Sequence, residues 1–387
     1  MMKKYCILPF ISVRIEDNKN LDSIGFRPCC LYKDKNLPCF TNIDDYLKSD
    51  FLKNLQQHLI TQDELPPGCN GCSTIESKKQ VSVRQLKNKF FQDLVLQQTD
   101  IQELDIFPSN TCNLTCIMCK PKFSSSVAAE QKKLGWITEI YNFDETDLIL
   151  DSLEQLSNLQ YIHIAGGEFF YSKHCLKILE VIQTAKIPNV EFITNGTICN
   201  DKHISILNTF ENLSLRFSID GIDDYYEFIR YPAKWNEVKT NILNYKNQLP
   251  NAHIETVMTV QPFNIFNILE WTQWANDNNI ETHWQLIGGD MGWGAITTKE
   301  KQLAADFLFS NYKKFKLDQK QLVTILNYAK NTIPNLPFTV QEREQFVFKL
   351  VQLCKHRKLT AESVTKLLGP WKELREIIAM ELSYIAY

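Results

Sequence analysis

Short apolar segments of strand length alternate with longer segments of helix length between residues 101 and 287. The strand candidates are residues 101–107, 161–165, 190–194, 213–219, 253–261 and 282–287. The helix candidates between them are residues 124–133 with 147–155, 173–185, 203–208, 234–248 and 266–278. Repeated strand–helix units predict a parallel sheet with crossover helices, and six units predict an α/β fold with a partial (β/α)6 TIM-like barrel. Functional side chains are then expected at the carboxyl ends of the strands.

The fourth strand candidate shows which face of the barrel is polar. Leu215, Phe217 and Ile219 alternate with polar residues, so the period is two. In a barrel, helices cover the apolar face of each strand. The polar face, which includes Arg216 and Ser218, therefore lines the lumen, where bound groups lie.

The segments on either side of the barrel differ from it and from each other. The chain has 387 residues, more than one hydrophobic core usually organises. Residues 1–100 are rich in cysteine, with helical patterns at 44–60 and 73–98 and turns at 25–30 and 66–72. Residues 297–387 read as helices broken near 334–337 and 369–370, after a glycine-rich link at 288–294. We therefore expect units at 1–100, 101–296 and 297–387.

Composition limits the classes of protein that the chain can belong to. The net charge is −3, from 42 basic and 45 acidic residues, which argues against a general nucleic-acid binder. No apolar run approaches the roughly 18 residues of a membrane span, and no signal-peptide pattern is present. We therefore expect a cytoplasmic protein with reduced thiols. Nine of its 12 cysteines lie before residue 120, and in that setting such clustering favours metal binding over disulfides.

The loop after the first strand candidate carries three of these cysteines. Cys112, Cys116 and Cys119 stand in the spacing Cys-x3-Cys-x2-Cys. Three thiolates on one loop can bind three irons of a cubic [4Fe–4S] cluster and leave the fourth iron open to another ligand. The alternative is a structural zinc loop that takes its fourth ligand from elsewhere.

The cysteine spacing and its position after a first barrel strand resemble the radical S-adenosylmethionine (SAM) superfamily. The resemblance implies two cofactors, a catalytic [4Fe–4S] cluster and SAM, whose amino and carboxylate groups bind the open iron. The chain departs from the family at Met118, where an aromatic residue usually packs by the adenine. A methionine can fill the same apolar space.

Further motifs follow in the order that the family shows. Gly166, Gly167 and Glu168 end the second strand candidate, and the resemblance implies that Glu168 accepts hydrogen bonds from the methionine amino group. Taken alone, Gly-Gly-Glu is more often a turn. Asn195 similarly follows the third strand candidate, where the family binds its cofactor.

The fourth strand and the helix after it supply the last cofactor-binding candidates. The resemblance implies that Ser218, with Asp220 beside it, reaches the ribose or the carboxylate of SAM, and that Arg230 pairs with that carboxylate. For Arg230 a surface ion pair is the alternative. Four residues on strand candidates face the predicted lumen and are candidates for substrate contact or for hydrogen bonding within the barrel: His163, Arg216, Glu255 and Gln285.

The remaining clustered cysteines lie in the N-terminal unit. They resemble the auxiliary-cluster "twitch" or SPASM domains, although those usually follow the barrel. The resemblance implies a second [4Fe–4S] cluster, and a structural zinc knuckle is the alternative. Cys29 competes with Cys30, and the spacing from Gly25 selects Cys30, while Cys39 is spare. The predicted ligands are Cys6, Cys30, Cys69 and Cys72.

The resemblance also implies an activity. Reductive cleavage of SAM gives a 5′-deoxyadenosyl radical, which abstracts a hydrogen atom from a substrate. The expected substrate is a ribosomally made peptide, with a small-molecule metabolite as the alternative, and the expected electron donor is a flavodoxin or ferredoxin. A non-catalytic iron–sulfur carrier or redox sensor is the competing class. Cys175, Cys199 and Cys354 are isolated and are expected to be small hydrophobic residues.

Overall fold

An eight-stranded sheet forms the centre of the molecule. The computed structural model describes residues 5–18, 23–34, 37–77, 81–92, 100–286 and 291–383. The strands lie in the order β2-β1-β3-β4-β5-β6-β7-β8, and β3 to β8 are all parallel. These six strands are β3 Glu103–Ile106, β4 Tyr161–Ile164, β5 Asn189–Thr194, β6 Asn212–Ser218, β7 His253–Val260 and β8 Glu281–Leu286. They confirm the predicted partial barrel and each of its strands.

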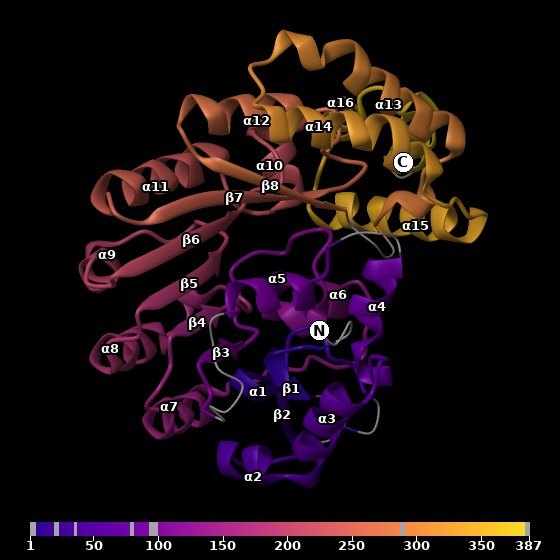
Figure 1. Cartoon of the computed structure of the whole chain (residues 1–387). Coiled ribbons are helices and arrows are strands. Elements are labelled where there is room, and N and C mark those ends of the chain that lie inside the picture. Colours follow the sequence, from indigo (N-terminus) through magenta and orange to yellow (C-terminus); the bar gives the residue numbers. More distant parts are fainter. Residues whose placement is uncertain are drawn as a thin grey trace.

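Crossover helices cover one side of this sheet. Figure 1 shows the sheet curved, with α7, α8, α9 and α11 along its outer side. The helices of this part are α6 Ser125–Lys133, α7 Thr146–Gln155, α8 Cys175–Ala185, α9 Asp201–Leu207, α11 Trp235–Gln248 and α12 Ile268–Asp277, all of which were predicted. A short helix that was not predicted, α10 (Asp223–Ile229), follows β6.

The apolar and polar residues that alternate along β6 lie on opposite faces of the strand, as predicted. Leu213, Leu215 and Phe217 are buried, and the residues between them are partly exposed. The apolar face packs against the outer helices, because the Phe217 ring lies 5.5 Å from the ring of Tyr245 on α11. The other face, with Arg216 and Ser218, turns toward the inside of the curved sheet.

Two strands of the N-terminal unit extend the sheet, and the sequence analysis was wrong to place none there. β1 (Ser12–Asn18) pairs in parallel with β3, and β2 (Ser23–Arg27) pairs antiparallel with β1. The segment 25–30 is therefore the end of a strand followed by a turn. The signal was present, because Val13 and Ile15 alternate with polar residues and are fully buried.

The helices of the N-terminal unit are shorter than predicted. They are α1 Leu8–Ile11, α2 Ile43–Lys48, α3 Asp50–Thr61, α4 Asn70–Ser77 and α5 Val83–Phe90. Ser49 divides the first predicted helix, since its hydroxyl accepts a hydrogen bond from the Leu52 N–H and caps α3. Ser82 starts α5 with a capping box to Gln85. Two helices, α4 and α5, therefore replace the predicted helix 73–98 over the residues up to Phe90. Residues 93–98 lie outside the described part.

The C-terminal unit is helical over its described residues, as predicted. It contains α13 Thr298–Asn311, α14 Gln319–Asn327, α15 Val340–His356, α16 Ala361–Leu368 and α17 Lys372–Ser383. The predicted breaks fall between α14 and α15 and between α16 and α17. Residues 288–290 of the glycine-rich link lie outside the described part. No described helix has the length and apolar character needed to cross a membrane.

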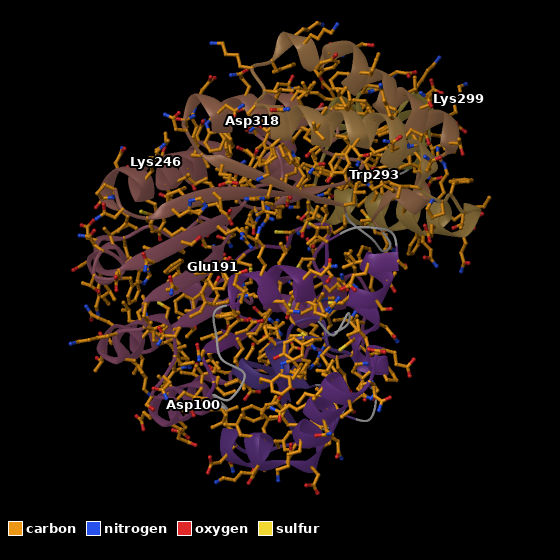
Figure 2. The ribbon with its side chains drawn as sticks, in the orientation of Figure 1. Asp100, Glu191, Lys246, Trp293, Lys299 and Asp318 are labelled. Atoms are coloured by element: carbon orange, nitrogen blue, oxygen red, sulfur yellow. The ribbon has the colours of Figure 1, made fainter. Side chains whose placement is uncertain are left out.

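The C-terminal helices share one hydrophobic core with the barrel. Trp371, which is fully buried, packs its ring 4.8 Å from that of Phe266, and its indole N–H donates to the Pro262 carbonyl at 3.0 Å. Trp293, labelled in Figure 2 and just before this unit, donates to the Val260 carbonyl at the end of β7, and its ring lies 6.5 Å from that of Trp371. The C-terminal unit is thus packed directly on the last barrel strands.

Replacing Trp371 tests this shared core. Trp371→Ala should lower the free energy of unfolding by about 3–5 kcal/mol, because it opens a large cavity between the barrel and α17. Denaturant unfolding followed by circular dichroism measures the change. Phe348→Ala is the matched control, since that ring is 57% exposed and its loss should change stability by less than about 1 kcal/mol. Equal effects of the two changes would contradict a shared core.

Candidate active site

A cavity of ≈ 390 Å³ opens at the carboxyl ends of the barrel strands. The cysteine loop contributes Cys112, Cys116, Met118 and Cys119 to its wall. The strand ends and the segment after α10 contribute the predicted residues Gly166, Gly167, Asn195, Ser218, Gln285 and Arg230. Ten of the residues singled out in the sequence therefore surround one space, as expected for parallel strands whose carboxyl ends converge.

The cysteine loop is held by hydrogen bonds from both of its sides. From α6 and its cap, the Ser124 hydroxyl donates to the Leu114 carbonyl at 2.9 Å and the Ser126 hydroxyl to the Cys112 carbonyl at 2.6 Å. From the last residue of α10, the Ile229 carbonyl accepts a hydrogen bond from the Ile117 N–H at 2.9 Å. The positions of the three thiols are thus set by secondary structure.

The thiols themselves fit an iron–sulfur cluster. Burial raises the pKa of Cys116 well above its usual range, and burial followed by the nearby Cys112 raises the pKa of Cys119 to about 11. Such thiols keep their protons unless a metal takes their place. Three thiols on one loop leave one iron of a cubic cluster open to another ligand, whereas a structural zinc ion takes four protein ligands.

Arg230 lies beside this loop. Its Nη1 is 3.9 Å from the Cys116 sulfur, and its Nε donates to Asp220 Oδ2 at 2.7 Å. Both side chains are buried, so the alternative of a surface ion pair is wrong. Asp220 also accepts a hydrogen bond from the Thr259 N–H at 2.6 Å and does not line the cavity. We therefore correct its predicted role from cofactor contact to orientation of Arg230.

Glu168 also differs from its expected role. Its carboxylate is buried and accepts hydrogen bonds from the Thr194 hydroxyl at 2.8 Å and the Asn195 N–H at 2.6 Å. It therefore joins the ends of β4 and β5, and its side chain is absent from the cavity wall. Gly167, at φ +46°, has no space for a side chain, since a Cβ would lie 2.2 Å from the Thr111 carbonyl. The Gly-Gly-Glu motif thus allows the end of β4 to pack directly against the cysteine loop.

Of the four lumen candidates, Gln285 alone lines the cavity. The other three belong to ion pairs deeper in the sheet. His163 Nδ1 is 2.9 Å from Asp105 Oδ1, and Arg216 pairs with Glu255. Hydrogen bonding within the barrel, the alternative considered for them, is what the structure shows.

The N-terminal cysteines separate into two environments. Cys6, Cys29 and Cys69 share a small apolar cluster, and Cys72 is also buried. Burial, with smaller contributions from the neighbouring thiols of Cys69 and Cys72, raises the pKa of Cys6 to about 12. Burial likewise raises the pKa of Cys29 well above its usual range, with Cys30 and Cys6 the nearest thiols.

The Cys30 side chain is not part of the cluster formed by Cys6, Cys29 and Cys69. It reaches solvent, yet the surrounding chain desolvates the thiol and raises its pKa to about 11. The charged groups that act on it are Asp105 and Arg14 of the sheet. The structure thus groups Cys29, not Cys30, with Cys6 and Cys69, and the ligand selected from the Gly25 spacing is revised. Cys39 is exposed, and of the isolated cysteines Cys175 and Cys354 are buried as expected, while Cys199 is partly exposed.

One residue that the sequence analysis did not consider, Arg357, reaches the cysteine loop from the end of α15. Its Nη2 donates to the Thr115 carbonyl, and its Nε donates to Glu130 Oε1 on α6 at 2.9 Å. The guanidinium also lies over the Tyr231 ring, 4.8 Å from its centroid. The side chain is 2% exposed. A basic residue in the last turn of a helix gives no signal that distinguishes it from an ordinary capping charge.

Comparison with known families agrees with this geometry. Residues 106–274 match the family model of the radical SAM superfamily. This segment is a radical SAM domain. It spans β3 to α12 and includes the cysteine loop, the Gly-Gly-Glu turn and Arg230. Domains of this family use a [4Fe–4S] cluster and SAM, so these two predicted cofactors are confirmed at the level of the family.

Individual relatives match parts of the chain. The sporulation killing factor maturation protein SkfB of Bacillus subtilis is 27% identical over 122 residues, 32% of this chain, and GTP 3′,8-cyclase of Desulforamulus reducens is 26% identical over 145 residues, 37% of this chain. The matches span 27% and 42% of those two proteins. Streptococcus suis SuiB bound to its precursor peptide SuiA shows a TM-score of 0.40 at 16% identity, covering 80% of this chain and 57% of SuiB.

Replacing Arg357 tests whether its contacts stabilise the cysteine loop. Arg357→Ala should destabilise the fold by about 3–5 kcal/mol, because Glu130 is left buried without its partner. It should also release iron from the catalytic cluster, since the Thr115 carbonyl loses its donor. Iron content and the electron paramagnetic resonance signal of the reduced cluster measure this second effect.

Arg343→Ala is the matched control for this experiment. Arg343 also lies on α15 and pairs with a buried glutamate, Glu300, at 2.8 Å, yet none of its hydrogen bonds goes to the loop. It should cost comparable stability and retain its iron. If both variants lost iron equally, the loss would reflect general destabilisation and not a contact of Arg357.

Proposed function

We propose that this protein is a radical SAM enzyme that abstracts a hydrogen atom from a peptide substrate. One observation carries the proposal: the three thiols, Arg230 and Ser218 line one cavity at the carboxyl ends of the strands. When bound there, the [4Fe–4S] cluster and SAM supply a 5′-deoxyadenosyl radical. An iron–sulfur carrier or sensor needs no such cavity beside its cluster, which argues against that class.

Each of these residues has a distinct task in the proposal. Arg230 is oriented by Asp220 through its Nε, so other N–H donors of its fork remain for the carboxylate of SAM. Gly166 and Gly167 bring the backbone close to the ligand. Ser218 and Gln285 offer neutral hydrogen-bonding groups toward ribose or substrate. Positioning and exclusion of water are therefore the work of the protein.

The charges around the cavity favour a peptide over a nucleotide. Among the described residues, two cationic side chains line it, Lys120 and Arg230, and Arg230 is already paired with Asp220. The deeper lumen is filled by paired charges such as Arg216 and Glu255. A triphosphate such as the substrate of the cyclase relative would require several free cations. The maturation protein SkfB supports the peptide assignment, and a neutral small metabolite remains the second candidate.

We further propose that the N-terminal unit binds an auxiliary [4Fe–4S] cluster. Four cysteines support it: Cys6 and Cys72 are buried, and Cys29 and Cys69 are partly buried and pack in the same cluster as Cys6. The alternative is that the same four thiolates bind a structural zinc ion. An external flavodoxin or ferredoxin would deliver the electron.

Binding of SAM tests the role of Arg230. Arg230→Lys keeps the charge but loses the planar fork, so the Kd for SAM should rise by about tenfold or more. Titration calorimetry on the cluster-loaded protein measures the Kd, and the yield of 5′-deoxyadenosine after reduction measures cleavage. Arg375→Lys, on α17, is the control and should behave as wild type. Loaded, reduced wild-type protein that formed no 5′-deoxyadenosine with any candidate substrate would favour the carrier class.

Iron content tests the auxiliary cluster. Loaded wild-type protein should carry about eight irons, and simultaneous replacement of Cys112, Cys116 and Cys119 by Ala should remove about half. Cys29→Ala should also lower the iron content, because its thiol lies with those of Cys6 and Cys69. Cys30→Ala is the adjacent control and should retain full iron. Tightly bound zinc in the N-terminal unit, or a loss of iron in Cys30→Ala alone, would count against this assignment.

A further inference from the structure

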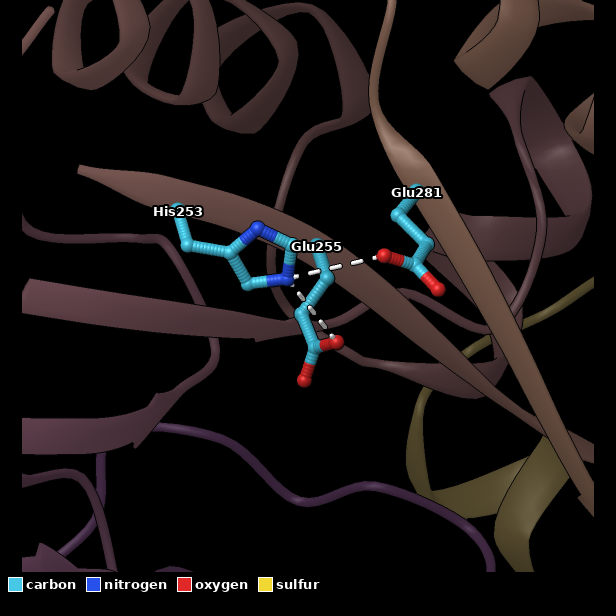
Figure 3. Close-up of side chains that lie close together, drawn as sticks. All are labelled: His253, Glu255 and Glu281. Carbon is cyan, nitrogen blue, oxygen red and sulfur yellow. Dashed lines mark ion pairs between the residues drawn. The ribbon is translucent and has the colours of Figure 1, made fainter. Parts of the chain in front are cut away.

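Two neighbouring strands carry mirrored pairs of metal-binding residues at the end of the sheet remote from the cavity. β7 begins His253-Ile254-Glu255, and β8 begins Glu281-Thr282-His283. Residues two apart on a strand share a face, and Glu255 is paired directly with Glu281 in the sheet register. The four side chains therefore gather on one face. Figure 3 shows three of them, with one imidazole nitrogen of His253 facing the carboxylates of both Glu255 and Glu281.

The distances between these donor atoms are those of a coordination shell. His253 Nε2 is 3.5 Å from Glu255 Oε2 and 3.6 Å from Glu281 Oε2. His283 Nε2 is 2.8 Å from Glu255 Oε2 and 3.4 Å from Glu281 Oε1. Tetrahedral zinc with nitrogen and oxygen ligands at about 2.0–2.2 Å holds neighbouring donors about 3.3–3.5 Å apart. The ligand atoms of His253, Glu255 and Glu281 all lie within 4.8 Å of one another, at nearly that spacing. His283 lies beside this group, within hydrogen-bonding distance of Glu255.

The surrounding groups keep the donors available. Arg216 pairs with Oε1 of Glu255 and leaves Oε2 for the two imidazoles, as an outer partner of a metal ligand does. Lys320, 3.0 Å from Glu281 Oε1, is 63% exposed and has a long side chain that can turn toward solvent.

From this geometry we propose that a borderline divalent cation of the Zn²⁺ class binds between β7 and β8 through His253, Glu255, Glu281 and His283. With His283 turned toward the same ion as the fourth ligand, the protein donors would form a closed set, which favours a structural role over a catalytic one. It would fix the start of β8, the edge strand of the sheet, whose other end carries Gln285 into the cavity. The inference does not depend on the proposed function, because the donors lie at the amino ends of the strands.

Zinc binding to the cluster-loaded protein tests the proposal, since loading occupies the cysteine thiols. After passage over a chelating resin, equilibrium dialysis against Zn²⁺ should show wild type binding about one ion per chain more than either His253→Ala or His283→Ala. Each variant should bind this ion at least about tenfold more weakly, because loss of a ligand costs no less than loss of an outer partner. Zn²⁺ should also raise the Tm of wild type and not that of the variants.

Two further variants keep the result interpretable. Glu281→Gln is nearly isosteric and exposed, so it should fold normally and still weaken binding. His174→Ala is the control, because His174 makes a single ion pair, 3.1 Å from Asp144 Oδ2, and should bind zinc as wild type does. Zinc binding that was equal in wild type, His253→Ala and His283→Ala would overturn the proposal. The four residues would then be ion pairs within the sheet.

Discussion

The parallel register of β3 to β8 is the constraint on which the rest of the structure depends. Parallel pairing requires every connection to cross the sheet through a helix, so one face of each strand must be apolar and covered. Leu215 and Phe217 satisfy this on β6, and their neighbours turn inward. Because all six strands then end on the same side, residues as distant in sequence as Gly166 and Gln285 line one cavity. The order and direction of the strands therefore determine where the site lies, and the individual side chains determine its chemistry.

The cysteine loop is too short to hold its own conformation, and the surrounding elements supply what it lacks. Serines before and within α6 bind its carbonyls, and the end of α10 and the segment after it accept from its N–H groups. Arg357 adds a charged contact from a residue 242 positions away. A buried Arg–Glu pair contributes little net stability, because desolvation offsets its attraction, but it disfavours every arrangement in which one charge is left alone. The Arg357–Glu130 pair therefore contributes specificity, because it fixes the position at which the C-terminal unit contacts the cysteine loop.

Much of this was available from the sequence, for reasons that particular residues make plain. The strands β3 to β8 follow from period-two patterns and the loop from its spacing, because both are local signals. β1 and β2 carried the same signal, but the surrounding cysteines drew the interpretation toward turns. The inward direction of Glu168 and Asp220 could not be predicted, since each depends on backbone donors, Asn195 and Thr259, supplied by the next strand. The choice of Cys29 over Cys30 likewise depends on chain direction, because adjacent side chains after a strand point opposite ways.

The addition of β1 to the sheet changes how the N-terminal unit relates to the radical SAM domain. β1 pairs with β3 over four residues, and Arg14 on β1 forms a buried ion pair with Asp105 on β3 at 2.6 Å. Asp105 in turn contacts His163 on β4, so a chain of charges joins the two units inside the sheet. Cys29 follows β2 by two residues, which ties the N-terminal cysteines to the same register. The separation between the two groups of cysteines is therefore set by hydrogen-bonded strands and not by a flexible linker.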